Sequence, residues 1–539
     1  MNTPVPMMEI ELNAWLLYSH LRTVFADTEV VSQGIDGTRH WTTYGEVDRR
    51  AHQLMHALDS LGLDRGVPVA TLAWNGYRHL EAYIGIPCSE RIMHTLNVRL
   101  SPEDLAFIIG HARDRAILFE TDLLPVLEQV HALGGLVGVE HLVVLDATVP
   151  DTTLPGVVAY EDLIHDEPTT YPSRAIDELT PMGMCYTSGT TGRPKGAVYT
   201  HRSTYLHASA VASPAAMNIG PTDTIFPVVP MFHASAWGMV HAGAASGAKQ
   251  VFLAGSATPA ALASLLHDER VTVTAGVPTV WHGLADELAS LGGRPPDLRA
   301  IICGGAQPPR VLIERYHRDF DIPVVQAWGM TESSPLASIA WPKAAYRDWD
   351  EGHLVDQVRT RAGLPLPGMN MRIQDDEGAD VPWDGVSMGN LLIRGPWVIN
   401  SYLYGEGADS FTEDGWFRTG DVAIGFPDGY FTIADRTKDL IKSGGEWISS
   451  VDMEAAIMSM PGVIEAAVIA IPDPRWDERP LACVVPASDF VISIEVVRDH
   501  LLANGFSKWQ LPDRLELIDE VPRTSVGKYD KKVLRARFV

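Results

Sequence analysis

The chain has 539 residues and a formal net charge of −26, with 46% hydrophobic and 20% charged residues. This composition is that of a globular protein, and the length predicts more than one domain, because single cores stop growing at roughly 250–300 residues. The acidic balance argues against nucleic acid or an anionic membrane surface as a partner.

Targeting signals are not visible in the sequence. No apolar run approaches the roughly 18 residues that a membrane-spanning helix needs, and Met1–Asn13 lacks the basic and apolar segments of a secretory signal. The cysteines form no CxxC pair, which disfavours a zinc site or a disulfide framework. They are Cys88, Cys185, Cys303 and Cys483. We expect buried, inert thiols in a soluble cytoplasmic protein, because that compartment keeps thiols reduced.

The first two-thirds of the chain alternate short apolar runs with helical patterns. Ser101 offers an N-cap and Pro102 a first helical residue, and apolar residues up to Ala112 share one face. A strand is expected next, at Ala116–Glu120. The pattern recurs at Val251–Ala254 with Pro259–Leu266, and at Ala300–Cys303 with Pro309–Tyr316. It predicts α/β layers of largely parallel strands, with active-site residues at the carboxyl ends of the strands.

The last third of the chain has a different texture. Glycine, proline and short β-like runs predict a β-rich subdomain at residues 365–430. A helix is then expected from Val451 to Pro461, a strand at Ala466–Ile471, and a helix around Ile494 to Leu501. We therefore expect an α/β fold with a large N-terminal domain (1–437) of layered βα subdomains and a small α+β C-terminal domain (438–539).

Residues 186–196 read YTSGTTGRPKG and follow the apolar stretch Met182–Cys185. The glycines let the backbone approach an anion, and four Ser and Thr hydroxyls together with Lys195 supply donors, so the segment fits a phosphate-binding loop after a strand. It is not a Walker A loop, because the GK[ST] ending is absent. Taken alone, such a loop is about as often a glycine-rich surface turn.

Further segments occur in a fixed order along the chain. They are Pro230–His233, Gln326–Glu332, Gly415–Asp421, Asp435–Asp439 and Pro522–Lys528. Together with the loop, they resemble the motifs of the AMP-forming acyl-CoA synthetases, in the adenylating superfamily that also holds luciferases and peptide-synthetase adenylation domains. His94–Leu100 and Ile441–Ser450 resemble the medium-chain branch of that family, which includes the methylmercaptopropionate-CoA ligases.

The resemblance implies a ligase that works in two steps. A carboxylate attacks the α-phosphate of ATP to give acyl-AMP and pyrophosphate, and the thiol of coenzyme A then displaces AMP. It also implies Mg²⁺, a small carboxylic acid substrate and a homodimer. The first expected acid is 3-methylmercaptopropionate, followed by short- and medium-chain fatty acids; aryl acids stay open. No nucleophile of the protein is needed, so positioning and charge stabilisation must supply the catalysis.

The resemblance also assigns roles to residues. Catalytic roles fall on Lys528, Glu332, Thr331 and His233, and the Mg²⁺ contacts on Thr187 and Glu332. The residues expected to bind ATP or coenzyme A are Thr187, Ser188, Gly189, Thr190, Thr191, Gly192, Lys195, Gly304, Gly305, Ala306, Gln326, Trp328, Gly329, Asp421, Arg436, Lys438, Gly445, Glu446 and Trp447. Those expected beside the acyl group are His233, Trp237 and Gly329. For His233, Trp237, Trp328 and Trp447, simple packing is the alternative role.

Three positions near the C-terminus complete these expectations. Lys438 matches a hinge about which the C-terminal domain rotates between the two steps, so this domain is expected to be mobile. Asp435 stands where the family usually has glycine. Lys531, close to Lys528, is expected to be solvated.

Other functions stay open at this stage. An adenylating enzyme that passes its acyl group to a carrier protein is the nearest, although Ser443–Ser450 favours coenzyme A and the chain has no carrier-like module. Light-emitting oxidation is required by no residue. A catalytically inactive nucleotide- or acyl-binding regulator is a different class, and the joint presence of Lys528, Glu332, Asp421 and Arg436 argues against it.

Lys528→Ala should lower the rate of adenylation by about 10²–10³-fold, because the ammonium group would offset the negative charge that grows on the phosphorus. Thioester formation from supplied acyl-AMP should suffer less. Pyrophosphate exchange measures the first step and a thioester assay the second. An equal loss in both steps would contradict the role given to Lys528.

Overall fold

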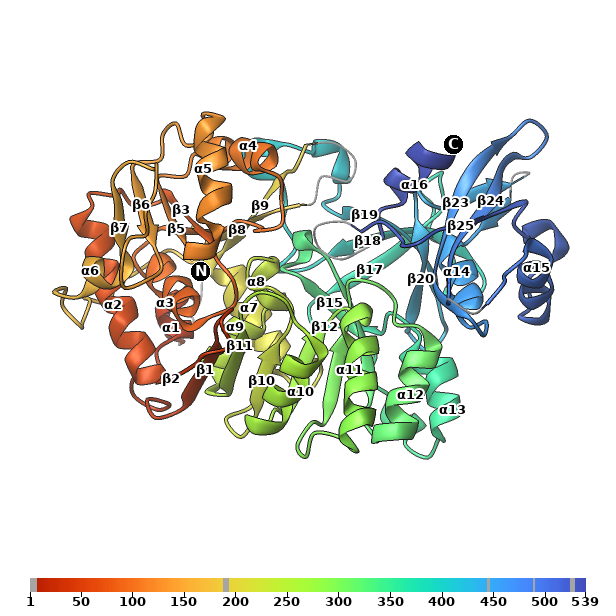
Figure 1. Ribbon diagram of the computed structural model, residues 1–539, viewed down its shortest axis with the longest axis horizontal. Coiled ribbons are helices and arrows are strands. Elements are labelled where there is room, and N and C mark those ends of the chain that lie inside the picture. Colours follow the sequence, from red (N-terminus) through yellow and green to blue (C-terminus); the bar gives the residue numbers. More distant parts are fainter. Residues whose placement is uncertain (1–6, 188–192, 444–445, 488–489, 524–528) are drawn as a thin grey trace, which may run out of the picture.

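The computed structural model describes residues 7–187, 193–443, 446–487, 490–523 and 529–539, with Glu446 described by its backbone alone (Figure 1). Two large sheets form the first two-thirds of the chain, as the alternating pattern predicts. Their strands are mostly parallel, and antiparallel pairs occur towards the sheet edges. The fold class predicted from the sequence is confirmed.

The first large sheet has seven strands in the order β7-β6-β5-β3-β4-β8-β9. All neighbouring strands are parallel except β8 and β9, which form a hairpin. The strands are β3 (Pro68–Leu72), β4 (Ile92–Thr95), β5 (Ala116–Phe119), β6 (His141–Val144), β7 (Val157–Ala159), β8 (Pro181–Tyr186) and β9 (Gly196–Thr200).

The second large sheet has nine strands in the order β16-β15-β14-β13-β12-β10-β11-β1-β2. Its central strands are parallel, while β2, β15 and β16 run antiparallel to their neighbours. The strands are β1 (Glu29–Gln33), β2 (Arg39–Thr43), β10 (Thr224–Pro227), β11 (Lys249–Leu253), β12 (Val273–Gly276), β13 (Ala300–Cys303), β14 (Val324–Gly329), β15 (Leu336–Ile339) and β16 (Leu364–Pro365).

Helices pack on both sheets, and one apolar core joins the two sheets (Figure 1). That core combines Val69 and Met182 of the first sheet, Val30 and Phe252 of the second, and Tyr83 of a helix between them. The helices are α1 (Ala14–Leu17), α2 (Tyr44–Ser60), α3 (Tyr77–Cys88), α4 (Pro102–Ala112), α5 (Leu124–Ala132), α6 (Tyr160–Ile164), α7 (His201–Ala212), α8 (Ala234–Trp237), α9 (Met239–Ser246), α10 (Pro259–Asp268), α11 (Pro278–Leu291), α12 (Arg310–Phe320) and α13 (Glu351–Leu354).

The predicted helix start at Ser101 is confirmed. The Ser101 hydroxyl accepts a hydrogen bond from the amide of Asp104 at 3.1 Å, and Pro102 is the first residue of α4. The strand that follows ends at Phe119, one residue earlier than expected. The expected strand–helix pairs correspond to β11 with α10 and β13 with α12.

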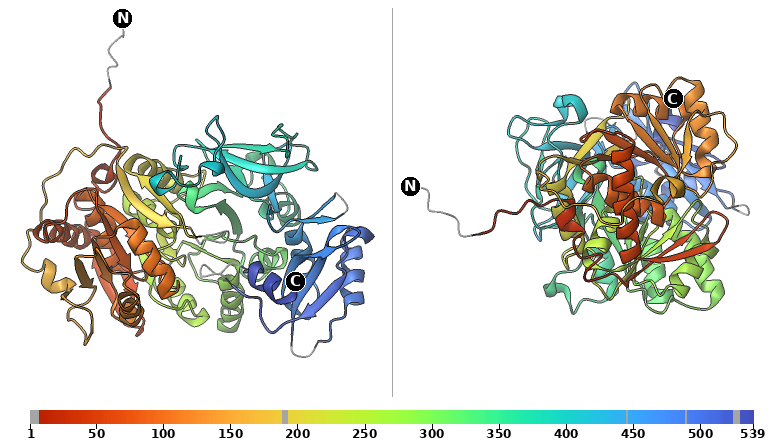
Figure 2. Two further views of the ribbon diagram at one scale, coloured as in Figure 1. Left: turned by 90° about the horizontal axis from the view of Figure 1, so that it is seen from above. Right: turned by 90° about the vertical axis from the view of Figure 1, so that its left-hand side faces the viewer.

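The last third of the chain forms two smaller sheets. The first is antiparallel, with strands β17 (Asn370–Gln374), β18 (Met388–Arg394), β19 (Phe417–Gly425) and β20 (Phe431–Arg436). The second contains β21 (Ile441–Ser443), β22 (Glu446–Ile448), β23 (Val463–Asp473), β24 (Asp477–Pro486) and β25 (Arg514–Leu517), with helices α14 (Ser450–Met458), α15 (Ile494–Ala503) and α16 (Lys531–Phe538). Figure 2 shows this last unit beside the four-stranded sheet, which it contacts through α14 and β20.

The four cysteines are free and buried, as expected from their spacing. Burial raises the pKa of the Cys88, Cys185 and Cys303 thiols, so these thiols stay protonated and unreactive at neutral pH. Within the described parts of the chain, no helix combines the length and the apolar character that a membrane crossing requires.

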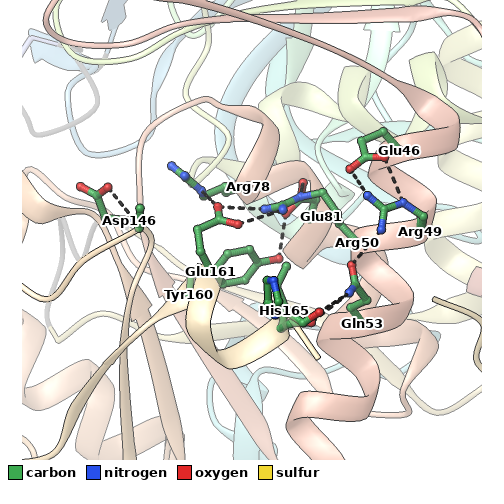
Figure 3. A network of polar contacts seen from close by, with 12 residues as sticks. Glu46, Arg49, Arg50, Gln53, Arg78, Glu81, Asp146, Tyr160, Glu161 and His165 are labelled. Carbon is green, nitrogen blue, oxygen red and sulfur yellow. Dashed lines mark hydrogen bonds and ion pairs between the residues drawn. The ribbon is translucent and has the colours of Figure 1, made fainter. Parts of the chain in front are cut away.

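An ion-pair network around the buried Glu81 joins the three helices α2, α3 and α6 (Figure 3). Arg50 of α2 contacts Glu81 of α3 at 2.6 Å and Glu161 of α6 at 2.9 Å. The Tyr160 hydroxyl donates to Glu81 at 2.8 Å, and Arg78 contacts Glu161 at 2.8 Å. The Glu81 side chain is 0% exposed, and burial raises its pKa even with Arg50 beside it. Arg50 is therefore the cation that makes a buried carboxylate tolerable at this position.

Arg50→Ala should lower the free energy of unfolding by about 3–5 kcal/mol, because it leaves the Glu81 carboxylate buried without a cation. Arg49→Ala is the matched control: it removes a pair with Glu46 whose side chains are 44% and 40% exposed, and should cost less than about 1 kcal/mol. Urea unfolding of both variants checks this. Equal costs for the two variants would show that the network does not stabilise the helices.

Candidate active site

The phosphate-loop candidate lies at the end of the β8–β9 hairpin, at the carboxyl end of a parallel strand. Tyr186 and Gly196 form the last register pair of the hairpin. Beyond them, the amide of Thr187 donates to the carbonyl of Lys195 at 2.9 Å, and the amide of Lys195 donates to the Thr187 hydroxyl at 3.2 Å. These bonds close the base of the loop and fix where Lys195 leaves the sheet. The Thr187 hydroxyl keeps a lone pair for a further contact.

Glu332 and Thr331 follow β14 in a short 3₁₀ turn, Thr331–Ser333. Gly329 ends the strand, and a Cβ there would lie 2.1 Å from the carbonyl oxygen of Pro335, so only glycine fits this close approach. The carbonyl of Thr331 accepts a hydrogen bond from the Tyr199 hydroxyl at 2.8 Å. Glu332 is 7% exposed, and its carboxylate accepts the Tyr402 hydroxyl at 2.6 Å.

This carboxylate fits the expected Mg²⁺ only as one ligand among others. Among the described residues, no group of three or more His, Cys, Asp or Glu side chains is placed to hold a metal ion. Mg²⁺ at phosphate sites commonly uses one or two carboxylates together with phosphate oxygens and water. Glu332, whose second carboxylate oxygen makes no hydrogen bond within the described residues, and the hydroxyl of Thr187 suit that arrangement with a nucleotide.

The expected ribose-binding pair is formed on two neighbouring strands. Asp421 on β19 and Arg436 on β20 are direct register partners, and their side chains form an ion pair at 2.7 Å. The indole N–H of Trp328 donates to the other Asp421 carboxylate oxygen at 3.0 Å. Asp421 is 2% exposed, so the pair and the indole hold the carboxylate in one orientation. Each oxygen retains a lone pair that a sugar hydroxyl can use.

The small residues after β13 bring the chain close to its neighbours. A Cβ at Gly304 would lie 2.7 Å from the carbonyl oxygen of Ala327 and 3.1 Å from the Trp237 ring, so a side chain has no room there. Gly305 and Ala306 continue this loop at the surface. Gln326 is buried, and the amide orientation that satisfies its surroundings has the nitrogen donating to the carbonyls of residues 360 and 361 at 3.3 and 3.2 Å. The Gln326 side chain therefore ties β14 to the backbone at residues 360 and 361.

His233 leads into α8, which is a single left-handed turn and not a regular α-helix. Ala234, Ser235, Ala236 and Trp237 have φ values of 42°, 56°, 49° and 57°, and none is glycine. A non-glycine residue in this left-handed conformation destabilises the folded chain by roughly 1–2 kcal/mol relative to a right-handed one. Backbone strain of this kind clusters at functional sites. Trp237 is 7% exposed, and its ring lies against Gly304 and Gly305. The turn thus places Trp237 beside the loop expected to contact the purine.

A small cavity borders this turn. Its walls carry sulfur and hydroxyl groups together with two histidines, and they include Tyr83, Met93, Thr95, Met182, Met184, Cys185, Tyr199, Thr204, His207, Ser235 and His241. Burial lowers the pKa of His207 to about 3 and that of His241 to about 4. Both rings are therefore neutral at physiological pH, and the cavity suits an uncharged, polarizable group.

The C-terminal part contributes fewer contacts to the described site. Lys438 lies at the surface, but its amine is partly covered by neighbouring groups, and this partial desolvation lowers its pKa. Trp447 is 36% exposed, with the Lys442 ammonium 5.0 Å from its ring centre. The expectation for Lys531 is wrong: this side chain is 8% exposed and pairs with Glu454 at 2.7 Å, because α16 packs its first residue against α14.

The structure brings several expected residues together and leaves others undescribed. Lys195, Thr331, Glu332, Trp328, Asp421 and Arg436 gather where the β8–β9 hairpin, β14 and the four-stranded sheet meet. Ser188, Gly189, Thr190, Thr191, Gly192, Gly445 and Lys528 lie outside the described residues, as does the Glu446 side chain. Sequence reasoning missed Tyr199 and Tyr402, since a lone tyrosine in a strand or loop carries no spacing signal.

Two family comparisons cover most of the chain. Residues 22–403 match the AMP-binding enzyme family, and residues 452–528 match the AMP-binding enzyme C-terminal domain. The solved anthranilate CoA ligase in complex with anthranoyl-AMP has the same fold, with a TM-score of 0.86, 24% identity and coverage of 98% of each chain.

Relatives of higher identity share nearly the whole length. The long-chain-fatty-acid–CoA ligase of Thermus thermophilus is 45% identical, covering 99% of this chain and 97% of that protein. The 3-methylmercaptopropionyl-CoA ligase of Ruegeria lacuscaerulensis is 40% identical, covering 97% of this chain and 96% of that protein. The medium-chain-fatty-acid–CoA ligase of Ectopseudomonas oleovorans is 38% identical, covering 99% of this chain and 97% of that protein. The chain therefore belongs to the AMP-binding enzyme family, as an AMP-forming acyl-CoA synthetase.

Proposed function

We propose that this ligase activates 3-methylmercaptopropionate or a short- or medium-chain fatty acid, through an acyl-adenylate, to its coenzyme A thioester. The observation that carries the proposal is the geometry of Glu332, Lys195 and the Asp421–Arg436 pair around the end of the β8–β9 hairpin. These groups provide a carboxylate, a cation and a ribose-binding pair where a nucleotide's metal, phosphates and sugar would lie. Relatives named for both classes of acid support the substrate range.

On this proposal the described residues of the site have three different roles: they bind phosphate and Mg²⁺, orient the ribose, and contact the acyl group. Lys195 offers positive charge at the base of the loop, and Glu332 with Thr187 would hold Mg²⁺, which when bound neutralises phosphate charge. Asp421 and Arg436 orient the ribose, which fixes the α-phosphate relative to the incoming carboxylate. His233 precedes the strained turn and is proposed to lie at the carboxylate end of the acyl group. Catalysis on this proposal is positioning plus charge stabilisation, because no covalent intermediate with the protein is required.

The acyl group is proposed to lie between His233 and Trp237, next to the neutral cavity. Met93, Met182, Met184 and Cys185 line that cavity, and such polarizable walls adapt to a thioether or a short alkyl chain. Trp237 closes the space against Gly304, which favours a short chain over a long one. Because another relative is named for long-chain acids, the preferred chain length is the first property to measure.

The expected domain limits and quaternary state belong to the same proposal. We place the boundary between residues 437 and 438, with the β-rich subdomain at 365–430 and a hinge at Lys438 that turns a mobile C-terminal domain between the two steps. Trp447 would then line the path of coenzyme A. The family resemblance further supports a homodimer in the cytoplasm, where the four free thiols stay reduced.

The first test is a competition among carboxylates. The protein is incubated with ATP, Mg²⁺, coenzyme A and an equimolar pool of methylmercaptopropionate, butyrate, hexanoate, octanoate, palmitate and cinnamate, and the thioesters are measured by mass spectrometry. We expect methylmercaptopropionyl-CoA or a C4–C8 thioester to dominate, with equal release of AMP. A dominant palmitoyl or cinnamoyl thioester would refute the substrate assignment. Adenylate without thioester would point to a carrier-protein acceptor.

Trp237→Ala should shift the preference towards longer acids, because it removes the ring that lies against Gly304. We expect the ratio of kcat/KM for dodecanoate to that for butyrate to rise by about 10-fold, the size of a pocket effect of one or two methylenes. Trp237→Phe keeps an aromatic ring and should change the ratio less. An unchanged chain-length profile in the folded Ala variant would exclude Trp237 as the end of the acyl pocket.

A further inference from the structure

We infer that Tyr402 is a positioning residue that holds Glu332 and Lys195, the two charged groups at the phosphate end of the site. Tyr402 lies in the segment between the strands β18 and β19 of the four-stranded sheet, far in sequence from both charged residues. The inference rests on the proposed function, because it assigns a role within the same site. On this inference Tyr402 touches no reacting atom itself and acts through Glu332 and Lys195, which are proposed to contact the nucleotide.

The first contact is the hydrogen bond to Glu332. The Tyr402 hydroxyl donates to one carboxylate oxygen at 2.6 Å, and both side chains are 7% exposed. The carboxylate oxygen can only accept, so the phenol is the donor in this bond. The bond fixes the plane of the carboxylate and leaves its other oxygen available to a cation. Outer hydrogen bonds of this kind orient metal ligands.

The second contact is with Lys195. The Lys195 ammonium lies 5.1 Å from the centre of the Tyr402 ring, within the range of a cation–π contact. Gly407 borders the same space, because a Cβ there would lie 2.6 Å from the Tyr402 ring and 3.2 Å from the Lys195 nitrogen. A side chain at position 407 would separate the two groups. The ring face therefore limits where the lysine side chain can go when no phosphate is bound.

The segment before Tyr402 also holds the backbone around Glu332. The amide of Ile399 donates to the carbonyl of Glu332 at 2.9 Å, and the Ser334 hydroxyl donates to the carbonyl of Trp397 at 2.8 Å. With the Tyr402 hydroxyl, these bonds fix both the main chain and the side chain of Glu332. The Tyr402 ring itself packs edge-on against Phe411 and Phe417, with ring centres 6.4 and 6.5 Å away. The phenol thus has a rigid support and is not free to follow the carboxylate.

Tyr402→Phe tests the inference, since it removes the hydroxyl and keeps the ring. We expect the Mg²⁺ concentration for half-maximal pyrophosphate exchange to rise about 10-fold, and MgATP binding measured by calorimetry to weaken by a similar factor. ATP binding in EDTA and the KM for the carboxylic acid should each change less than about 2-fold. General damage to the fold would instead raise the half-maximal Mg²⁺ concentration and the KM for the acid, weaken ATP binding with and without Mg²⁺, and lower the melting temperature.

Tyr404→Phe is the matched control. Tyr404 lies two residues further along the chain and is 55% exposed. This variant should match the unmodified enzyme in its Mg²⁺ dependence. In a Glu332→Gln background, Tyr402→Phe should add no further change in Mg²⁺ dependence, because the two residues act as one unit.

Each outcome separates the inference from the proposed function. An unchanged Mg²⁺ dependence in folded Tyr402→Phe, or additive effects in the double variant, would overturn the positioning role while leaving the ligase activity intact. An unmodified protein that shows no pyrophosphate exchange with any carboxylate would instead refute the proposed function. A lower melting temperature with unchanged Mg²⁺ dependence would assign Tyr402 to packing alone.

Discussion

The hydrogen bond from Trp328 to Asp421 crosses between two sheets, and it orients the carboxylate on which the proposed ribose contact depends. Trp328 lies on β14 of the nine-stranded sheet, and Asp421 lies on β19 of the four-stranded sheet. The same carboxylate pairs with Arg436 on the next strand. Because Asp421 is buried, breaking the bond would leave one of its carboxylate oxygens without this donor. The Asp421–Arg436 pair, which we propose to bind the ribose, is thereby held near the end of β14, after which Glu332 follows.

The local charge of the site differs from that of the whole molecule. The chain carries a formal charge of −26, yet ATP is an anion. Lys195 and Arg436 supply positive charge at the site, and the histidines lining the neighbouring cavity are held neutral by burial. Carboxylates within the site are occupied by donors: Glu332 by a phenol and Asp421 by an indole and a guanidinium. A carboxylate that accepts hydrogen bonds from these donors repels phosphate less than a free one does. The site can therefore accept a nucleotide although the protein as a whole is acidic.

Local sequence signals predicted the elements well, because their causes are local. The cap at Ser101, the apolar face of α4 and the strand at Ala300–Cys303 depend on neighbouring residues. Motif resemblance then pointed to Glu332, Asp421 and Arg436, whose side chains the structure describes, while the loop at 188–192 and Lys528 lie outside the described residues; the roles of all of these residues stay predictions. Tyr402 was beyond sequence reasoning, since its partners lie 70 and about 200 residues away. The left-handed turn at Ala234–Trp237 was missed as well, because propensity rules reserve that conformation for glycine.

The junction before the small C-terminal unit shows why Asp435 can replace the usual glycine. Its carboxylate is 1% exposed and accepts the amides of Arg436 at 2.7 Å and Ser450 at 2.6 Å. Ser450 begins α14, so Asp435 places negative charge at a helix start, where it is favourable. Burial raises the pKa of Asp435, while the charge of Lys531 opposes that rise. Lys531 is buried for the same reason: it neutralises Glu454 and offsets Asp435 at one junction. Glycine would leave the Ser450 amide and the Lys531 charge with fewer partners, so the aspartate and the buried lysine form one electrostatic unit.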